Sequence, residues 1–557
     1  MEPKLNYAFK LAIFLHKVLC TEYNFENDFE KTELNLEGMN ITLLNRNVKF
    51  CKKLTVLRLG KNDLKVLPDE IEKLESLEKL TLEENKIRAL PVRIGNLKNL
   101  KVLRLSNNPL KSLPTGLWDC AKLEALTIDN LFLEEPLSEK IGNLRNLKFL
   151  NLSLNNLGKI PGSMAQLKNL VSLNLDHNNL YFLPEELRTM KNLEELRFQQ
   201  NNLGLLPDFV KNLKNLKILD LEENNLTLLN PNLFNCSRLE KLLLNSNNLA
   251  SLPNEIGNLA HLKELNVSRN ILNELPDKIG NLEELECLNL KTNKLVKLPD
   301  TIENLTQLSS FDIQDNNLKE FPTKIGKLKK LKNLDLSHNR LSSLPTTMGE
   351  LPDLEWLDAS HNKLCRLPEM IGKLVKLKDL YLSHNRLSSL PETMEELLHL
   401  KRVDLSNNLF EVLPEMICKL INLKSLDLSH NRLSSLPTTI GELVNLQKLC
   451  LKFNSLVVLP KTIGKLEKLE YLYLGYNQID ALPKTIGKLA SLKCLSICHN
   501  KLDVLPREIC DLNKNKDVSV HINLQGNEIL EFGIDDNTFG KKELKSVFKR
   551  RVRLNTN

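Results

Sequence analysis

The sequence has few aromatic residues and lacks the apolar run of a membrane span. Phe, Trp and Tyr make up 5% of the 557 residues, so any apolar core must be built from aliphatic side chains. No stretch approaches the roughly 18 apolar residues that cross a bilayer. The apolar segment Leu11–Leu15 is closely bracketed by Lys10, His16 and Lys17, and it is shorter than the core of a signal peptide. We predict neither a transmembrane segment nor a signal peptide.

Catalytic motifs are also missing. The sequence has no G-x-x-x-x-G-K-[ST] phosphate loop, no nucleophile elbow, no protein-kinase signature and no H-E-x-x-H helix. We therefore predict a protein that is not an enzyme and that needs no cofactor or metal.

Net positive charge is small outside the C-terminus. Residues 541–557 hold seven Lys or Arg against one Glu, which is +6 of the net +7. The other 540 residues carry a net charge of only +1, which does not favour the basic stripe of a nucleic-acid-binding protein. Two interpretations of the basic tail Lys549–Arg553 remain: it contacts an anionic surface, or it is the solvated face of a terminal cap.

The 11 cysteines are spread along the chain and do not cluster near its ends. This distribution is typical of a reducing compartment. Cys51, Cys120 and Cys236 lie at a position where the repeat described below usually has Leu, so we expect small buried hydrophobic side chains there. Cys494 and Cys498 are predicted to be free thiols.

One repeat fills almost the whole chain. Each of twenty-two copies follows L-x-x-L-x-L-x-x-N-x-L-x-x-L-P-x-x-I-G-x-L, as in residues 331–351. The Asn position recurs at 39, 62, 85, 108, 131 and 155, then every 23 residues to 500, and last at 527. Only Met39 and Leu131 replace Asn there. This period and pattern are specific to leucine-rich repeats.

The repeat predicts an α/β solenoid. The L-x-x-L-x-L segment alternates with period two and predicts a short strand, and strands of successive repeats should pair in parallel. The Asn is expected to bond backbone groups of the adjacent repeat. The L-P-x-x-I-G-x-L segment predicts a helical or 3₁₀ turn on the opposite side, with its Gly serving the turn.

Solenoid ends expose their core and need caps. We predict three regions: an N-terminal helical cap over residues 1–30 with its helix at 4–20, the solenoid over 31–530, and a basic C-terminal cap or tail over 531–557. Residues 539–548 are the candidate second cap.

Two irregularities interrupt the pattern. Leu131 is followed by a 24-residue step and by Phe132–Pro136 in place of L-x-x-L-P, which is either a kink or a tolerated insertion. The decapeptide Leu-Ser-His-Asn-Arg-Leu-Ser-Ser-Leu-Pro recurs unchanged at 336–345, 382–391 and 428–437. The segment 331–445 therefore looks like a duplicated pair of repeats. Its near-identity reflects either the duplication itself or selection for a binding site.

The outward strand position four residues before each Asn is polar along the chain and acidic in its later part. Carboxylates on adjacent strands repel one another, and such a row suits a basic partner. The alternative is that the aspartates have no binding role, because L-D-L-S-x-N is a common form of the repeat. The candidate residues of this row are Asp312, Asp335, Asp358, Tyr381, Asp404 and Asp427.

Histidines collect immediately before the Asn, as at His338, His361 and His384. Three on consecutive strands would suit a metal or a pH sensor, but side chains in one column point the same way, whereas a metal needs convergence. An exposed polar rim is the favoured interpretation.

An aromatic cluster is predicted near the C-terminal end of the repeats. Tyr471, Tyr473 and Tyr476 lie close together in sequence, and Trp356 stands in the acidic segment. Because Tyr and Trp are frequent interface anchors, we expect these four residues to contact a protein partner.

The 23-residue repeat over residues 34–530 resembles the repeat of intracellular leucine-rich repeat proteins related to Ras-pathway scaffolds and the Ras suppressor. Similar repeats occur in bacterial proteins. The resemblance implies a horseshoe with a parallel concave β-sheet that binds proteins. The charged N-terminal tail of the Ras scaffolds is absent here, and extracellular members usually have cysteine-bonded caps that this chain does not resemble.

Two functions follow as hypotheses. The first is a cytoplasmic, non-enzymatic scaffold for protein partners, in a small-GTPase pathway. The second is a microbial protein that is secreted into a host cell or recognises a host. The repeat does not transfer a particular partner, because unrelated functions share it.

Overall fold

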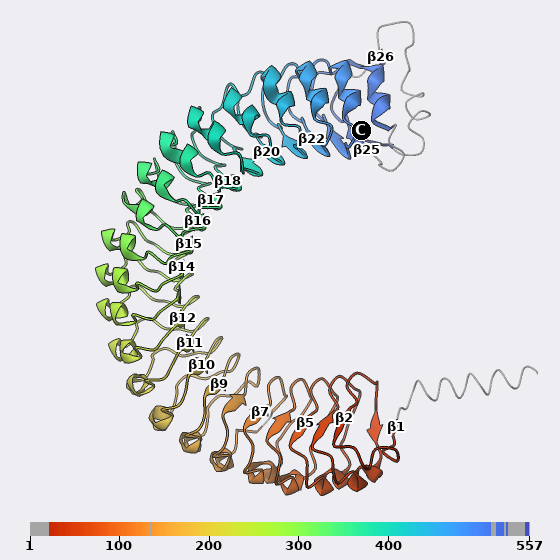
Figure 1. Ribbon diagram of the computed structural model, residues 1–557, viewed down its shortest axis with the longest axis vertical. Coiled ribbons are helices and arrows are strands. Elements are labelled where there is room, and N and C mark those ends of the chain that lie inside the picture. Colours follow the sequence, from red (N-terminus) through yellow and green to blue (C-terminus); the bar gives the residue numbers. More distant parts are fainter. Residues whose placement is uncertain (1–21, 134, 514–519, 528–530, 533–551, 556–557) are drawn as a thin grey trace, which may run out of the picture. The chain divides into compact units, whose positions relative to one another are not determined.

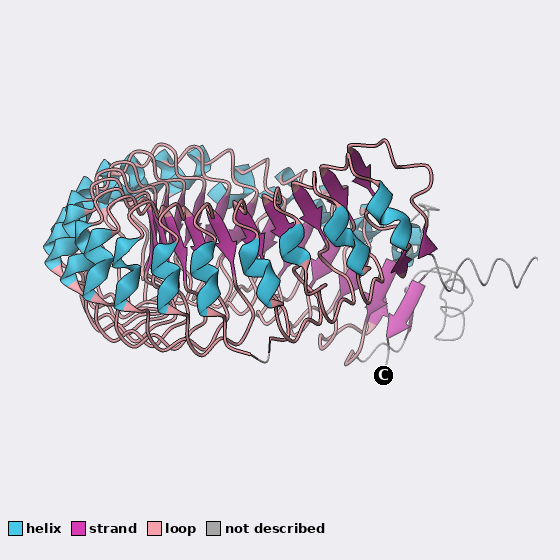
Figure 2. Cartoon of the chain, turned by 90° about the horizontal axis from the view of Figure 1, so that it is seen from below, coloured by secondary structure: helices cyan, strands magenta, loops and turns pink. Residues whose placement is uncertain are grey.

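The computed structural model describes residues 22–133, 135–513, 520–527, 531–532 and 552–555. The chain divides into two compact units, Met1–Asn270 and Ile271–Asn557, called unit 1 and unit 2 below. Within each unit the strands line one side and the 3₁₀ helices lie on the opposite side (Figure 1). Figure 2 shows the same two layers, with strands in magenta and helices in cyan.

In unit 1, nearly every repeat contributes one strand and one 3₁₀ helix. The strands are β1 Glu22–Tyr23, β2 Glu33–Asn35, β3 Leu43–Leu44, β4 Val56–Arg58, β5 Lys79–Thr81, β6 Val102–Arg104, β7 Ala125–Thr127, β8 Phe149–Asn151, β9 Ser172–Asn174, β10 Glu195–Arg197, β11 Ile218–Asp220, β12 Lys241–Leu243 and β13 Glu264–Asn266. The 3₁₀ helices are η1 Arg46–Phe50, η2 Asp69–Lys73, η3 Ile94–Asn96, η4 Thr115–Asp119, η5 Glu139–Asn143, η6 Gly162–Gln166, η7 Glu185–Thr189, η8 Asp208–Asn212, η9 Pro231–Asn235 and η10 Asn254–Asn258.

Unit 2 repeats the same arrangement. Its strands are β14 Cys287–Asn289, β15 Ser310–Asp312, β16 Asn333–Asp335, β17 Trp356–Asp358, β18 Asp379–Tyr381, β19 Arg402–Asp404, β20 Ser425–Asp427, β21 Lys448–Cys450, β22 Tyr471–Tyr473, β23 Cys494–Ser496, β24 Val504–Leu505, β25 Val520–Asn523, β26 Glu531–Phe532 and β27 Val552–Asn555. Its 3₁₀ helices are η11 Asp277–Asn281, η12 Asp300–Asn304, η13 Ile325–Lys327, η14 Thr346–Glu350, η15 Glu369–Lys373, η16 Glu392–Glu396, η17 Glu415–Lys419, η18 Thr438–Glu442, η19 Lys461–Lys465, η20 Lys484–Lys488 and η21 Arg507–Asn513.

All strand pairs that the structure describes in these sheets are parallel. In unit 1, β2 and β4–β13 pair in chain order, with Leu57 opposite Leu80 as an example of the 23-residue register. In unit 2, β14–β23 pair in order and are followed by β25 and β27. The predicted parallel strands and 3₁₀ turns are confirmed.

The core is a stack of aliphatic side chains between the sheet and the helices. Leu334, Leu336 and Leu341 are fully buried, as are their equivalents in most other repeats. The Ile-Gly glycines have a different role from the one expected. A Cβ on Gly349 would lie 2.1 Å from the carbonyl oxygen of Met370 in the next repeat. This glycine is therefore needed for close packing of neighbouring 3₁₀ helices and not for the turn.

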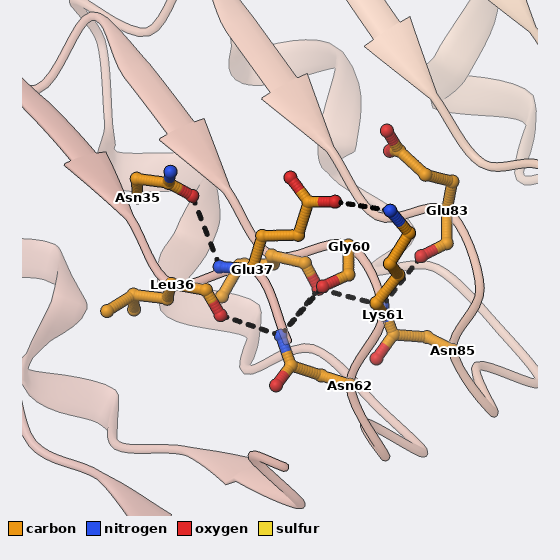
Figure 3. Close-up of polar contacts among 9 residues, drawn as sticks. Asn35, Leu36, Glu37, Gly60, Lys61, Asn62, Glu83 and Asn85 are labelled. Atoms are coloured by element: carbon orange, nitrogen blue, oxygen red, sulfur yellow. Dashed lines mark hydrogen bonds and ion pairs between the residues drawn. The ribbon is translucent and has the colours of Figure 1, made fainter. Parts of the chain in front are cut away.

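Where the repeat has its Asn, the side-chain amide joins two repeats, as Figure 3 shows for Asn62. Asn62 Nδ2 donates to the carbonyl oxygens of Leu36 at 2.8 Å, Leu59 at 3.0 Å and Gly60 at 3.1 Å. Its Oδ1 accepts the backbone N–H of Ile41 at 2.9 Å. The predicted bonding to the adjacent repeat is confirmed, and we call the set of these contacts the asparagine ladder.

Wherever the pattern places the Asn, the residue before it has a left-handed backbone. Its φ is +53° at Lys61, +53° at His338 and +58° at Tyr476. In this conformation the N–H of His338 reaches the carbonyl oxygen of Ser360, 3.0 Å away in the next repeat. The backbone ladder thus continues through the turn, and this offsets part of the cost of placing non-glycine residues there.

Leu131 shows how the ladder adapts where Asn is missing. In other repeats, the Asn of the following repeat accepts the backbone N–H two residues after the ladder position. Leu131 has no such acceptor for the N–H of Leu110. That N–H bonds the carbonyl oxygen of Asn108 instead, at 2.9 Å. The side chain of Leu131 is buried and that of Phe132 is exposed. A hollow of about 440 Å³, lined in part by Trp118, Leu133 and Pro136, lies beside the irregular segment.

The predicted caps fall largely outside the described residues, because these exclude both 4–20 and 539–548. β1, which belongs to the predicted N-terminal region, pairs with β3 of the predicted solenoid. β26 and β27 belong to the predicted C-terminal region. β26 pairs with β24, and β27 extends the sheet of unit 2 beyond β25.

Replacing Asn339 by Leu should lower the free energy of unfolding by about 3 kcal/mol, because it orphans buried backbone groups. Asn339 accepts from Leu318 N–H and donates to the carbonyl oxygen of Ile313, both at 3.0 Å. Urea denaturation followed by circular dichroism measures the change. Ser342→Leu, on an exposed neighbour, is the matched control. Equal midpoints for the two variants would contradict a structural role of the ladder.

Candidate functional site

The solvent-facing side of the sheet in unit 2, here called the strand face, carries the predicted site residues. In each three-residue strand the middle side chain is buried and the two flanking ones face outward, as in β17 and β22. Two parallel rows result. The first row holds Asn333, Trp356, Asp379, Arg402, Ser425, Lys448, Tyr471 and Cys494. The second row holds Asp312, Asp335, Asp358, Tyr381, Asp404, Asp427, Cys450, Tyr473 and Ser496.

The aspartates of the second row have a structural contact that the sequence reading missed. Oδ1 of Asp335 accepts the backbone N–H of Ser337 at 2.9 Å and its hydroxyl at 2.6 Å. The equivalent backbone bond is made at each of the other four positions. These are Asp312 at 3.0 Å, Asp358 at 2.8 Å, Asp404 at 2.9 Å and Asp427 at 2.9 Å. Each aspartate therefore caps the turn that follows its strand.

A signal for this capping role was present in the sequence. Asn151, Asn174 and Asn266 stand at the same repeat position in unit 1 and accept the equivalent N–H. Exchange between Asp and Asn indicates a demand for a side-chain oxygen and not for a charge.

The charges of the row are nevertheless poorly solvated. Burial raises the pKa of Asp358, and the carboxylates of Asp335 and Asp404 raise it further. Burial likewise raises the pKa of Asp404, with Asp427 adding to the effect. A cationic group laid over this row would favour the ionised carboxylates and relieve their repulsion.

Two aromatic pairs flank the middle of the row. Trp356 and Tyr381 have ring centroids 5.9 Å apart at an angle of 52°. Tyr471 and Tyr473 have centroids 6.4 Å apart, and Lys452 Nζ lies 4.7 Å from the Tyr473 ring centre. All four rings are partly exposed. They present apolar area in the way that interface anchors do.

A buried carboxylate fixes the cation next to the first pair. Asp379, 8% exposed, accepts two bonds from the Arg402 guanidinium, the second of them from Nη2 to Oδ2 at 2.7 Å. This bidentate contact raises the pKa of Arg402 and holds its planar group beside Tyr381. The sequence reading had not singled out either residue.

Tyr476 lies apart from the other two tyrosines, in the turn after β22. Its ring stacks on Phe453 and His499, with centroid distances of 4.3 and 4.4 Å. His361 stacks in the same way between His338 and His384, at 4.0 and 3.9 Å.

The histidines do not converge on a point. Their rings lie face to face within 14° of parallel, so their nitrogens lie side by side. Burial, together with the neighbouring His338 and His384, lowers the pKa of His361. Over the part of the chain that the structure describes, there is no group of three or more His, Cys, Asp or Glu that suits a metal.

The cysteines agree with the sequence reading. Cys51, Cys120 and Cys236 are fully buried, and burial raises the pKa of Cys120 to about 11. Cys494 and Cys498 are free.

The solvent-facing side of the sheet in unit 1 has a hollow of about 190 Å³, lined in part by Phe149, Glu195 and Arg197. Glu195 pairs with Arg197 at 2.6 Å and accepts the Ser172 hydroxyl at 2.8 Å. Beside this group, burial raises the pKa of Asp176 to about 6.

Comparison with known proteins identifies the family. The leucine-rich repeat region family matches residues 210–317, 310–404 and 388–475, and the Leucine Rich Repeat family matches 99–120, 146–167 and 169–190. The chain therefore belongs to the leucine-rich repeat proteins. No curated protein sequence matches it.

Solved structures agree. A leucine-rich repeat protein of Leptospira interrogans is 32% identical over 76% of this chain and 100% of that one, with a TM-score of 0.63. The plant peptide hormone receptor RGFR1 in complex with RGF2 is 28% identical over 91% and 87%, with a TM-score of 0.74. The Arabidopsis receptor kinase HAESA, in complex with the peptide hormone IDA and the co-receptor SERK1, is 29% identical over 91% and 88%, with a TM-score of 0.69.

These similarities leave two earlier expectations as hypotheses, the Ras-scaffold subtype and the cytoplasmic location. Within the described residues, no helix has the length and apolar character that crossing a membrane requires.

Replacing Asp176 by Asn should stabilise the protein at pH 7 but not at pH 4. The pKa of Asp176 rises from 3.8 to about 6 on folding, so the folded protein retains a proton that the unfolded chain has lost. Stability therefore falls as the pH rises through this window. We expect a gain on the order of 1 kcal/mol at pH 7 after allowing for solvent screening.

Urea denaturation at pH 4 and pH 7 measures the difference. Oδ1 of Asp176 accepts the Gln199 N–H at 2.7 Å, and the Asn oxygen preserves this bond. Asp480→Asn, at an exposed site in unit 2, is the control. A gain of equal size at both pH values would show that the buried charge is not its cause.

Proposed function

We propose that this protein is a non-enzymatic recognition protein that binds a polypeptide partner on the strand face of unit 2. The observation that carries the proposal is the pattern of that face: two aromatic pairs separated by the carboxylates of Asp404 and Asp427. Leucine-rich repeat proteins use such extended strand surfaces for binding proteins. The two plant receptors named above were solved with peptide hormones, which supports a peptide or protein ligand here as well.

The spacing of these features defines the partner. The β18 and β22 strands are four strand spacings apart, about 19 Å. A partner segment with apolar groups at its two ends and a basic group between them matches the order Trp356–Tyr381, Asp404–Asp427, Tyr471–Tyr473. Arg402, held by Asp379, offers an additional donor for a carbonyl or carboxylate group of the partner.

Two biological settings are compatible with this binding mode. The first is a cytoplasmic signalling scaffold in a small-GTPase pathway, supported by the resemblance of the repeat sequence and by cysteines that are spread along the chain and do not cluster near its ends. The second is a microbial protein that recognises a host, supported by the 32% identity to the Leptospira interrogans protein. Locating the protein in its native cell separates them.

Tyr473→Ala should weaken partner binding by about 2 kcal/mol, roughly thirtyfold, while leaving the denaturation midpoint nearly unchanged. Its ring is partly exposed and contacts Lys452 and Tyr471 without entering the core. The partner is first isolated by crosslinking in native lysate, and its Kd is then measured with purified protein. Tyr181→Ala, at a tyrosine that is 65% exposed in unit 1, is the control. Equal affinities for the two variants would remove Tyr473 from the binding surface.

The triple variant Asp335→Asn, Asp358→Asn, Asp404→Asn tests the acidic row. Asparagine keeps the oxygen that caps the turn and removes the charge, so we expect stability to be retained while a basic partner binds about tenfold more weakly. Isothermal titration with the isolated partner measures the change. The control variant Asp277→Asn, Asp300→Asn, Glu415→Gln removes three exposed charges from the first residues of η11, η12 and η17. An unchanged Kd in the first variant would show that the row only caps turns.

A further inference from the structure

A second surface of unit 2 lies along the turns that follow its strands. We call it the turn edge, and it comprises residues 338–343, 361–366, 384–389, 407–412 and 430–435. Its Lys and Arg side chains are all exposed. They are Arg340, Lys363, Arg366, Arg386 and Arg432. Glu411 is the one carboxylate in these segments, so the turn edge has a formal charge of +4 with its histidines neutral.

These cations differ from the ion-paired cations of unit 2 in having no acidic neighbour. Lys376 pairs with Asp353 at 2.6 Å and Lys493 with Glu470 at 2.6 Å, each across one repeat. Within the described part of the chain, none of the five turn-edge cations has a carboxylate oxygen within the 4.0 Å of an ion pair. Their charge is therefore available to a ligand.

The fold does not require cations at these positions. In unit 1, the position of Arg340 is held by an asparagine in five successive repeats. These asparagines are Asn156, Asn179, Asn202, Asn225 and Asn248. The asparagine ladder is complete in those repeats as well, for example at Asn201 and Asn224. Four like charges in five repeats repel one another, so the row stabilises nothing by itself.

The chemistry of the turn edge favours a carboxylate-rich chain. Guanidinium groups bind carboxylates in a bidentate manner, and the exposed hydroxyls of Ser342, Ser343, Ser388 and Ser389 add donors. The neighbouring rings of His338, His361 and His384 cover each other's faces. The ring of His361 therefore has no free face on which a nucleic-acid base would stack.

We propose that the turn edge binds an acidic polypeptide segment. From Arg340 to Arg432 there are four repeat steps, about 19 Å at the strand spacing. An extended chain covers this distance with about six residues. An acidic segment of that length thus places carboxylates opposite every cation of the row. This surface is separate from the strand face, and its partner need not be the same molecule.

The test uses the full chain and a fluorescein-labelled decaglutamate peptide, with binding followed by fluorescence anisotropy at 50 and 150 mM NaCl. The edge variant is Arg340→Gln, Arg386→Gln, Arg432→Gln, which changes the same residue of the three identical decapeptides. The matched control is Lys376→Gln, Lys419→Gln, Lys493→Gln, which removes three cations that are ion-paired. Both variants have the same net charge, and circular dichroism verifies that both fold.

We expect the edge variant to bind decaglutamate at least tenfold more weakly than the wild-type protein, and the control to bind within twofold of it. The strand-face variant Asp335→Asn, Asp358→Asn, Asp404→Asn should keep its affinity, so this result is distinguishable from any result on the proposed function. An equal loss in the edge and control variants would overturn the proposal, because net charge alone would then explain binding. Tighter binding of labelled oligothymidylate or of a sulfated oligosaccharide, lost in the edge variant, would also overturn the assignment to an acidic polypeptide.

Discussion

The side-chain amide of one asparagine per repeat is the interaction on which the rest of the structure depends. A turn that leaves a three-residue strand exposes carbonyl and N–H groups that no regular sheet satisfies, and these groups are buried here. Asn339 supplies both the donors and the acceptor that they need. A carboxylate could only accept and a leucine could do neither, so this position tolerates little variation. At Leu131 the backbone must find another acceptor, and the segment that follows departs from the regular turn.

The asparagine ladder also determines at which positions the side chain can differ from one repeat to the next. Because it fixes the backbone on both sides of the Asn, the residue before it is forced into a left-handed conformation even when that residue is Phe453 or Tyr476. The side chains at this position then stand in one column and stack across repeats, as the histidines do. The fold thus prescribes the positions and directions of the outward side chains but not their chemistry. Binding specificity resides in those side chains.

Much of the fold was predictable from the sequence, because period and composition depend on local rules. The 23-residue spacing, the alternating leucines and the Pro and Gly punctuation predict the strand, the 3₁₀ turn and the ladder. The role of glycines such as Gly349 was not predictable, since it depends on how closely the next repeat's carbonyl approaches. The same holds for the candidate site. Asp335 was correctly placed on the outward face, but its bond to Ser337 emerges only from the turn geometry.

Contacts between repeats were the hardest to predict. Asp379 and Arg402 are 23 residues apart and meet because their strands are in register, so a single-repeat reading treats each as an ordinary polar residue. Tyr476 is three residues from Tyr473, yet the left-handed turn between them separates the two rings. Short sequence distance suggested one cluster of three tyrosines. The structure contains one pair on the strand face and a third ring in the stacked column of the turns.

Comparison between repeats also shows which charges of unit 2 the fold does not require. Exposed ion pairs contribute little stability, typically less than 1 kcal/mol each, so pairing such as that of Lys376 with Asp353 is not needed for folding. It does, however, neutralise a cation that would otherwise attract anions. The turn edge lacks this neutralisation although residues of either charge are common elsewhere in the unit. In unit 1 the position of Arg340 is neutral at five successive asparagines, and elsewhere along the equivalent turns Lys61 pairs with Glu37 at 2.9 Å. Because the repeat accepts neutral, paired and unpaired residues at this edge without loss of the ladder, folding does not explain the cationic row, whereas an anionic partner does.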